Sequence, residues 1–304
     1  MFCQPMGQNQ VRRLTLTVSP RQEGVQVDTL LRRVLGLSGT LVKRAKRTAD
    51  GILLDGQPVW VTARVRAGQI LSVAVGDPPG ASGDIAPAPG PVDIVYEDGD
   101  ILILNKPAGV AMHPSPGHDL DTLGNFVVFY YHQCGHSPIF RPVNRLDRGT
   151  SGLLCAAQHA YAHEKLKAAL HTPAFQRVYL AVCQGTPPRA AGVIDAPIGR
   201  AEGSSLRREV RPDGQSACTH YEVLSVSGGR SLVRLVLDTG RTHQIRVHMA
   251  HMGCPLTGDF LYGTETAEIS RPALHARALA LRHPVTGAAM EWESPLPADM
   301  AALL

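Results

Sequence analysis

The sequence predicts an α+β protein in which a small αβ domain precedes a larger domain built on a mixed, largely antiparallel sheet. Residues 77–91 are rich in proline and glycine, a composition typical of a linker. After this linker, strand-like runs are adjacent and hairpin-like, which favours antiparallel pairing over repeated βαβ units. We therefore expect a flexible tail over residues 1–13, a small domain over 14–76, the linker, and a large domain over 92–304.

Length and composition are those of a globular protein. The 304 residues, of which 44% are hydrophobic, are enough for a sizeable core, and no apolar run reaches the roughly 18 to 20 residues of a membrane helix. The first residues lack the basic-then-apolar order of a signal peptide. Six dispersed cysteines without a C-x-x-C pair indicate reduced thiols rather than a disulfide framework or a zinc site. We expect a cytoplasmic monomer with no membrane partner.

Basic residues are concentrated in the first domain. Up to Gly76 there are 11 Lys and Arg residues against 4 Asp and Glu, which leaves 19 basic and 22 acidic residues for the rest of the chain. This asymmetry indicates a basic module that binds nucleic acid, attached to a near-neutral domain with a different task.

Two short helices and a small sheet are expected in the first domain. Asp28 is placed to cap a helix that stops at Gly36, and Ser38 to cap a second helix. Short strands broken by turns follow, and an alternating run over residues 70–75 closes the domain. One face of the second helix is basic and suits docking on a phosphate backbone, although a solvated charged face is the simpler alternative. The basic residues of this face are Lys43, Arg44, Lys46 and Arg47.

The order of these features resembles the S-four RNA-binding domain over about residues 14–76. The shared features are two helices, the basic run, an Asp-Gly turn and a closing R-x-G-Q-x-L-x-V strand. The resemblance implies that the basic helix contacts RNA.

The second domain mixes strand-like and helical segments. An arginine-rich polar segment at 199–212 is expected to be an exposed loop. Helices are expected at 121–131, 160–171 and 241–251. Strands are expected at 92–97, 101–105, 153–157, 175–182, 221–226 and 231–237.

A carboxylate between two arginines stands at the centre of this domain, in Arg145-Leu146-Asp147-Arg148. Nearby guanidinium groups favour the ionised carboxylate. The Gly-Thr-Ser-Gly run that follows predicts a tight turn in which the backbone can approach a ligand closely. Taken alone, a surface ion pair before a turn is the simpler interpretation, so a catalytic role needs support from elsewhere in the chain.

Other chemistries find less support. His243, His248 and His251 offer metal ligands, but their spacing matches no common site, and hydrogen-bonding histidines are the alternative. No G-x-S-x-G elbow surrounds Ser151. Neither G-x-G-x-x-G nor G-x-x-x-x-G-K-[ST] occurs, so no dinucleotide site or P-loop is expected.

Several spaced motifs resemble, in their order, the RluA-like pseudouridine synthase family over about residues 92–295. The resemblance implies isomerisation of uridine to pseudouridine in RNA without a cofactor or metal. The bond from ribose to the base nitrogen breaks, and the uracil turns over and rejoins the sugar through its carbon five. The motifs are Asn105-Lys106-Pro107-Ala108-Gly109, Arg145-Leu146-Asp147 with Thr150-Ser151-Gly152-Leu153, Arg177-x-Tyr179-x-Ala181, Gly240-Arg241-Thr242-His243-Gln244-Ile245-Arg246-Val247-His248, and Gly258-Asp259-x-x-Tyr262-Gly263.

The resemblance also implies residue roles. Asp147 matches the essential aspartate, which acts as a nucleophile or as a base toward the sugar. Tyr179 matches the tyrosine that stacks on the target base, and Arg246 matches the arginine that pairs with the aspartate. Arg145 matches the residue that fills the space left when the base flips out of the RNA. Two neighbours in the Arg246 motif are also expected at the RNA interface, namely Arg241 and His243.

The RNA target stays open from the sequence. The domain order resembles enzymes of large-subunit ribosomal RNA, whereas transfer-RNA enzymes share every catalytic motif. Two other classes are a non-catalytic, ribosome-associated RNA-binding protein and a metal-dependent RNA hydrolase that uses the histidines. The intact set of Asp147, Tyr179 and Arg246 argues against the first of these.

Overall fold

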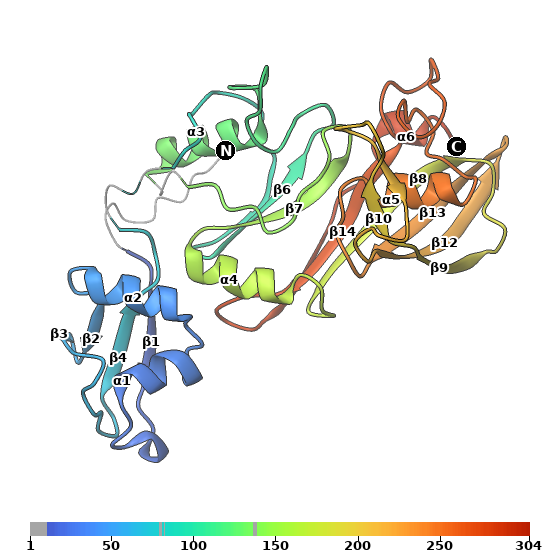
Figure 1. Cartoon of the computed structure of the whole chain (residues 1–304). Helices are drawn as coiled ribbons and strands as arrows, with labels where there is room; N and C mark the ends of the chain where they lie inside the picture. The colour runs from blue at the N-terminus through green and yellow to red at the C-terminus, as the bar shows by residue number, and fades with distance from the viewer. Residues whose placement is uncertain (1–10, 79–80, 82, 136–138) are drawn as a thin grey trace.

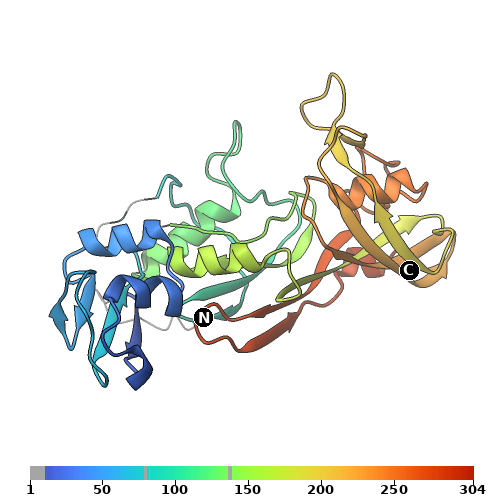
Figure 2. The same cartoon turned by 60° about the horizontal axis from the view of Figure 1, so that its bottom comes forward.

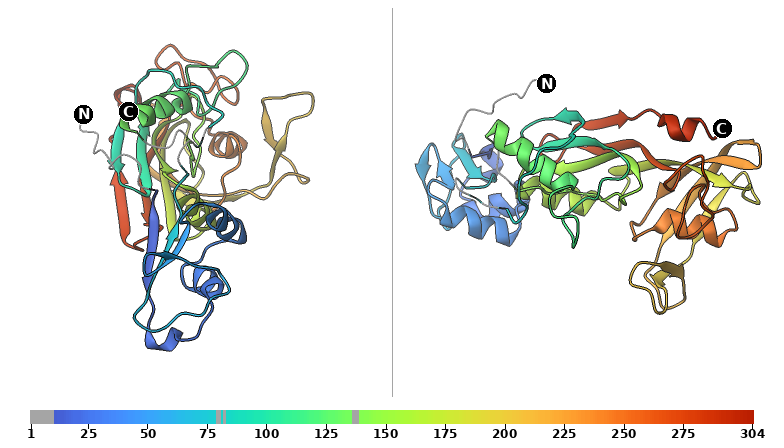
Figure 3. Two further views of the ribbon diagram at one scale, coloured as in Figure 1. Left: turned by 90° about the vertical axis from the view of Figure 1, so that its left-hand side faces the viewer. Right: turned by 90° about the horizontal axis from the view of Figure 1, so that it is seen from above.

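The computed structural model describes residues 11–78, 81, 83–135 and 139–304. A small N-terminal domain, blue in Figure 1, lies beside a larger domain built on one extended sheet. The molecule is elongated, with the small domain at one end (Figure 3).

The small domain is a four-stranded antiparallel sheet, in the order β1-β4-β2-β3, with short helices packed against it. Strand β1 pairs along its whole length with β4. The strands are β1 (Arg13–Thr17), β2 (Ile52–Leu54), β3 (Gln57–Pro58) and β4 (Ile70–Ala74). The helical segments are η1 (Pro20–Gln22), α1 (Val27–Thr29), η2 (Leu30–Val34) and α2 (Gly39–Arg47).

The first helix begins differently from the prediction. Asp28 lies in its first turn, whereas the N-cap position belongs to Gln26. The first two N–H groups of the helix donate to the carbonyls of Ala63 and Val61, at 3.0 and 2.9 Å. Because backbone carbonyls of a distant loop satisfy these donors, no capping side chain is needed. The Asp28 carboxylate instead accepts from Arg32 at 2.7 Å.

The large domain contains a nine-stranded sheet in the order β5-β6-β7-β14-β8-β13-β12-β9, with β15 paired to β14. Only the β7–β14 pair is parallel within the described sheet, so the predicted α+β fold with a mixed, largely antiparallel sheet is confirmed. The strands are β5 (Ile94–Glu97), β6 (Ile101–Lys106), β7 (Ser151–Ala157), β8 (Phe175–Gln184), β9 (Ala191–Asp195), β12 (Cys218–Ser227), β13 (Arg230–Leu237), β14 (Leu274–Arg282) and β15 (Ala289–Glu293). The helices are α3 (Leu123–Cys134), α4 (Ala160–Ala169), α5 (Gln244–His251) and α6 (Ala298–Ala301).

Alternating side chains of β6 enter two separate cores. Leu102 and Leu104 pack in the cluster that contains residues of α3 and α5. Ile101 and Ile103 pack in the cluster that contains residues of α4. Successive residues of a strand point to opposite faces, so helices cover both faces here and all four side chains are buried.

The predicted arginine-rich loop contains a small antiparallel ribbon. It consists of β10 (Ile198–Arg200) and β11 (Arg208–Val210), which pair in register. The predicted exposed loop over 199–212 is therefore strand at five of its residues, 199, 200 and 208–210, because the ribbon provides local backbone partners.

Side chains cross the junction between the two domains, where α4 lies next to the small domain (Figure 2). Tyr161 of α4 is buried in the apolar cluster of the small domain, and its hydroxyl donates to the Leu35 carbonyl at 2.9 Å. Arg12 donates twice to Asp100, at 2.8 Å each, and His159 contacts the same carboxylate at 2.8 Å. Arg12 and the first residue of β1 are therefore ordered, although the predicted tail included both; residues 1–10 lie outside the described part.

The described part of the linker packs on the large domain at both of its ends. At its start, Asp77 accepts two bonds from Arg141, at 2.8 and 2.9 Å. Near its end, Gly90 lies so close to Phe126 that an added Cβ would stand 2.3 Å from the ring. The described residues at the two ends of the linker are therefore held against the large domain.

Two composition-based expectations concern cysteines and membranes. Cys155, Cys183, Cys218 and Cys254 are free thiols, whereas Cys134 is disulfide-bonded, so the prediction of six reduced thiols is wrong at that position. None of the helices in the described ranges is both long and apolar enough to cross a membrane.

Candidate active site

A pocket of ≈ 350 Å³ opens where the turn before β7, the middle of β8 and the start of α5 meet. Residues far apart in the sequence line it together, as the spaced motifs predicted. Six of the predicted site residues are in its wall: Arg145, Asp147, Tyr179, Arg241, His243 and Arg246.

Asp147 occupies the turn that leads into β7. Its carbonyl accepts the N–H of Thr150 at 3.0 Å, and its side chain is 31% exposed, so the carboxylate is open to the pocket. In the Gly-Thr-Ser-Gly run that follows, Gly152 allows close approach to a neighbouring strand. Gly152 has φ +107°, and an added Cβ would lie 2.3 Å from the Ala276 carbonyl oxygen of β14. The predicted close backbone approach is therefore to the parallel neighbour strand.

Arg246 on α5 faces this carboxylate, but its tight partner is another residue. Its Nη1 lies 3.9 Å from Oδ2 of Asp147. Its Nε and Nη2 donate to the two oxygens of Asp259, at 2.7 Å each. Arg246 is 4% exposed and Asp259 is fully buried. A bidentate, charge-assisted pair of this kind fixes the guanidinium plane, which leaves one edge of it for Asp147.

Asp259 had no predicted role, although it lies in the Gly-Asp-x-x-Tyr-Gly motif. Its carboxylate also accepts the N–H groups of Leu261 and Tyr262, at 3.1 and 3.2 Å. The ring of Tyr262 lies 5.0 Å from the Arg246 guanidinium, within cation–π range. The Gly-Asp-x-x-Tyr-Gly motif therefore fixes the position of the Arg246 side chain. The presence of Asp259 in this motif was the sequence signal for that role.

His243 contacts the group of side chains that fixes Arg246. Its Nδ1 lies 2.9 Å from the Tyr262 hydroxyl, which also accepts the N–H of Arg208 at 2.8 Å. Burial lowers the pKa of His243, so the ring is neutral near pH 7 and its Nδ1 can accept from the tyrosine. His243 thus positions the aromatic ring, in addition to lining the pocket.

Helix α5 begins at Gln244 instead of the predicted residue 241. His243 has a left-handed backbone, with φ 59° and ψ 19°. The side-chain oxygen Oε1 of Gln244 accepts from the backbone N–H of Arg241 at 2.9 Å and from the Thr239 hydroxyl at 2.8 Å. The Arg241 guanidinium donates to the Ser216 carbonyl at 2.9 Å. A turn stabilised by the Gln244 side chain therefore takes the place of the predicted first turn of the helix.

Tyr179 lies in the middle of β8, opposite Ala276 of β14 and Leu235 of β13. It is 4% exposed. Burial raises the pKa of Tyr179, and the charge of Asp147 raises it further against the opposing effect of Arg177. The phenol is therefore protonated at neutral pH, at the base of a pocket that also holds a carboxylate.

The side chains predicted to contact RNA differ in their exposure and in their hydrogen bonds within the protein. Arg145 is exposed at the pocket. Arg44 is partly buried, and its Nη2 donates to the carbonyls of Val75 and Gly76, at 2.9 and 2.8 Å. Arg44 therefore holds the end of the small domain just before the linker, and its phosphate contact stays a prediction. The other basic side chains of α2 are exposed: Lys43, Lys46 and Arg47.

Lys106 is a second residue without a predicted role. It ends β6, is 1% exposed, and donates from Nζ to the carbonyls of Pro107, Val110 and Arg148, at 2.8, 2.8 and 3.2 Å. Burial lowers the pKa of Lys106 to about 7, although the charge of Asp147 raises it. Lys106 thus links Arg148, the residue after Asp147, to the loop that follows β6. The sequence signal for this role was the position of Lys106 in the Asn-Lys-Pro-Ala-Gly motif.

Comparison with known proteins identifies this arrangement. Residues 100–251 match the model of the family described as RNA pseudouridylate synthase. This chain belongs to that family. It is therefore an RNA pseudouridine synthase, an isomerase, and the RluA-like resemblance is confirmed. The family match does not extend to the small domain, so the likeness of residues 14–76 to the S-four domain stays a prediction.

Relatives of this synthase cover most of the chain. An RNA pseudouridine synthase of Bacillus subtilis, YjbO, is 39% identical over 270 residues, which are 89% of this chain and 95% of the relative. Ribosomal large subunit pseudouridine synthase D of Pseudomonas aeruginosa is 43% identical over 70% of this chain and 71% of its own length. The solved structure of human RNA Pseudouridylate Synthase Domain Containing 1 is 28% identical and superposes with a TM-score of 0.56, over 68% of this chain and 85% of the human chain.

The histidines of α5 do not converge in the synthase. His248 is fully buried, with Nδ1 2.9 Å from the Thr219 hydroxyl and Nε2 2.9 Å from the Ala196 carbonyl, whereas His251 is exposed. The ring of His248 therefore links α5 to the sheet as a hydrogen-bonding histidine. Among the described residues, the two clusters with metal-ligand geometry contain none of His243, His248 and His251.

His275 supplies a pH-dependent contribution to the stability of the synthase. It is 1% exposed, with Nδ1 2.9 Å from the Ser151 hydroxyl and Nε2 3.3 Å from the Ser294 carbonyl. Burial lowers its pKa to about 4. Between that value and about 6.5, the unfolded chain binds the proton and the folded one does not, so stability present above pH 6.5 is lost as the pH falls.

We expect this residue to account for about 3 kcal/mol of unfolding free energy lost between pH 6.5 and 4. His275→Gln should show a correspondingly shallower pH dependence in urea denaturation, and His251→Ala, which removes an exposed histidine, should keep the wild-type slope. Equal slopes for His275→Gln and wild type would refute the assignment.

Proposed function

We propose that this synthase converts uridines of large-subunit ribosomal RNA to pseudouridine. Relatives from Pseudomonas aeruginosa and Escherichia coli that are named ribosomal large subunit pseudouridine synthase D are 43% and 40% identical to it over 70% of the chain. The exposed basic side chains of α2 add a surface that suits a phosphate backbone. The proposal of a large-subunit target is based on these relatives.

Asp147 is the residue to which we assign the chemistry, because its open carboxylate faces a guanidinium that Asp259 holds in place. It attacks the sugar carbon or removes a sugar proton, and the bond from that carbon to the base nitrogen breaks. The uracil then turns over and its carbon five bonds to the sugar. As this bond forms, the bond from Asp147 to the sugar carbon breaks or, on the other route, Asp147 returns the sugar proton. The proton on carbon five then leaves while the freed nitrogen gains one. The product is an isomer, so atoms and electrons balance without a co-reactant.

The neighbouring residues make this step possible. Arg246 places a positive charge 3.9 Å from Oδ2 of Asp147, beside the carboxylate that both roles use. Tyr179 offers a ring against which a flipped base can stack, an interaction worth about 1 to 3 kcal/mol. Arg145, exposed at the pocket, is placed to fill the gap that the base leaves in the RNA.

Site-resolved mapping of pseudouridine tests the target. We expect one or more large-subunit ribosomal sites to lose the modification in a strain without the gene. A plasmid copy of the wild type should restore these sites, and a copy with Asp147→Asn should not. Changes confined to transfer RNA would overturn the ribosomal target and leave the isomerase activity intact.

The basic face of α2 makes a measurable prediction about RNA affinity. Replacing Lys43, Lys46 and Arg47 together by glutamine should weaken RNA binding and reduce the slope of log affinity against log salt by about 2 to 3, because each phosphate contact contributes about 0.7 to 0.9. Filter binding over a salt series measures the slope.

Arg44→Gln is the matched control on the same helix. Since Arg44 bonds to the carbonyls of Val75 and Gly76, this variant should lower the melting temperature and leave the salt slope unchanged. A slope equally reduced in Arg44→Gln, or unchanged in the triple variant, would place the RNA elsewhere.

A further inference from the structure

Three side chains of different chemistry converge on the outer face of the sheet, on the face opposite to α5. Cys218 and His220 lie two residues apart on β12 and so share a face. The residue between them, Thr219, bonds to His248 of α5 and so points the other way. Asp238 follows the last residue of β13, and its backbone N–H donates to the Cys218 carbonyl at 3.3 Å.

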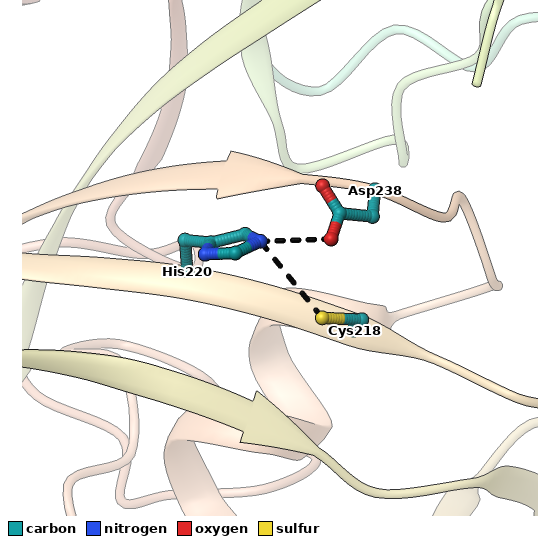
Figure 4. A group of neighbouring side chains, drawn as sticks. All are labelled: Cys218, His220 and Asp238. Atoms are coloured by element: carbon teal, nitrogen blue, oxygen red, sulfur yellow. Dashed lines mark hydrogen bonds and ion pairs between the residues drawn. The ribbon is translucent and has the colours of Figure 1, made fainter. Parts of the chain in front are cut away.

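The ligand atoms of this cluster already stand close together (Figure 4). Nε2 of His220 lies 2.8 Å from Oδ2 of Asp238 and 3.9 Å from Sγ of Cys218. All three atoms lie within 4.8 Å of one another. The side chains of His220 and Asp238 are 45% and 57% exposed, so an ion can reach them from solvent.

We propose that Cys218, His220 and Asp238 bind a thiophilic divalent cation, with Zn²⁺ as the ion that fits best. Zinc takes sulfur at about 2.3 Å and nitrogen or oxygen at about 2.0 to 2.2 Å in a tetrahedral arrangement. Those bond lengths separate a sulfur and a nitrogen ligand by about 3.5 Å, close to the 3.9 Å found here. Only the short His220–Asp238 contact must open to admit the ion.

The fourth coordination position has a candidate on the neighbouring strand. Asp195 of β9 lies directly opposite Cys218 in the register, and side chains of directly opposed residues share a face. Its charge acts on the Cys218 thiol. Asp195 or a water molecule can therefore complete the tetrahedron.

The thiol separates this cluster from ordinary exposed His–Asp pairs. His118 and Asp121 form such a pair at 2.7 Å, without a sulfur atom in the group. Because a metal ion binds cysteine as the thiolate, binding of the cation displaces the thiol proton, so a proton is released when the ion binds.

The other described cluster with ligand geometry, Asp98, Asp100 and His283, does not offer an equivalent site. Two side chains from other elements already occupy the Asp100 carboxylate, since Arg12 donates to both of its oxygens and His159 contacts one. A cation there would have to displace a bidentate guanidinium, whereas the cluster around Cys218 contains no such competitor among its described contacts.

The position of the cluster gives the ion a structural effect on the synthase. The Cys218 backbone N–H donates to the Thr239 hydroxyl at 3.0 Å, and its carbonyl accepts from the side chain of Gln244 at 3.0 Å. Gln244 begins the helix that carries Arg246. An ion held by β12 and the end of β13 would therefore brace the turn that places this arginine.

Metal binding by the full-length chain tests the proposal. After treatment with a chelator and dialysis, we expect one Zn²⁺ per chain, with a dissociation constant below about 1 μM in competition with a chromophoric chelator. Cys218→Ser and His220→Ala should each weaken binding by about 100-fold. Co²⁺ should produce a thiolate-to-cobalt charge-transfer band that Cys218→Ser lacks, and the heat of binding should vary with the ionisation enthalpy of the buffer.

His118→Ala is the matched control, because it removes a histidine from the sulfur-free pair, and it should bind as the wild type does. Equal melting temperatures of metal-free wild type and Cys218→Ser would show that the variant folds, and added Zn²⁺ should then raise only the wild-type value. Substoichiometric binding, or binding unaffected by both Cys218→Ser and His220→Ala, would overturn the site. The proposal uses no residue assigned to the reaction, so its failure leaves the proposed function untouched.

Discussion

Asp147→Asn lowers the rate of pseudouridine formation by at least about 10⁴-fold, the scale on which removal of an essential catalytic group acts. The amide keeps the shape of the side chain but can neither attack the sugar carbon nor accept its proton. Single-turnover assays on an RNA fragment measure the rate, and filter binding measures affinity. Affinity should stay within a few-fold of the wild type, because the basic surface is unchanged.

Asp213→Asn is a suitable control for the loss of one negative charge. This aspartate is 70% exposed and pairs with Arg211, away from the pocket lining. It should retain the wild-type rate. Measurable turnover by Asp147→Asn at more than a few per cent of the wild-type rate would remove Asp147 from the reaction centre.

Asp259→Asn lowers the free energy of unfolding by about 3 to 5 kcal/mol, because it leaves the buried guanidinium of Arg246 without a counter-charge. Activity should also fall, since the arginine is no longer held by the two bonds of 2.7 Å. Chemical denaturation measures the first effect, and single-turnover kinetics at a temperature where the variant is folded measures the second.

Asp299→Asn provides the matched comparison. Asp299 also accepts a bidentate pair, from Arg271 at 2.7 and 2.9 Å, but its side chain is 43% exposed. Its replacement should lower the free energy of unfolding by about 1 kcal/mol or less. Equal losses in the two variants would show that burial of the Arg246–Asp259 pair is unimportant.

A double variant separates stability from chemistry. Arg246→Met combined with Asp259→Leu removes both charges, so it should recover most of the stability that Asp259→Asn loses. It should remain inactive, because the guanidinium that faces Asp147 is then missing. Recovery of activity along with stability would contradict the role proposed for Arg246.

Features that depend on a few neighbouring residues could be predicted from the sequence. Ser38 caps α2, where its hydroxyl accepts the N–H of Leu41 at 3.2 Å, and the strands predicted at 101–105 and 175–182 agree with the observed β6 and β8. Residues of the spaced motifs also lie in one pocket. Their grouping could be predicted from the resemblance to a family, because no local pattern indicates it.

Features that depend on distant partners needed the tertiary structure. The pattern around Asp28 indicates a cap, yet carbonyls more than thirty residues away satisfy the helix. Arg44 belongs to a basic face by its spacing, yet the carbonyls of Val75 and Gly76, just after the domain's last strand, hold it. A sequence pattern shows which groups can bond, but not which of several distant partners will be closest.

Periodicity, composition and ordered motifs along the chain were enough to predict the fold class and the family. The way in which the charged side chains pair became clear from the tertiary packing. Arg246 faces Asp147 at 3.9 Å but binds Asp259 at 2.7 Å, and the glycine run after Asp147 approaches β14. The physical reason is that the strength of an ion pair depends on distance and burial, and for residues up to a hundred positions apart the packing of the sheet and helices determines both.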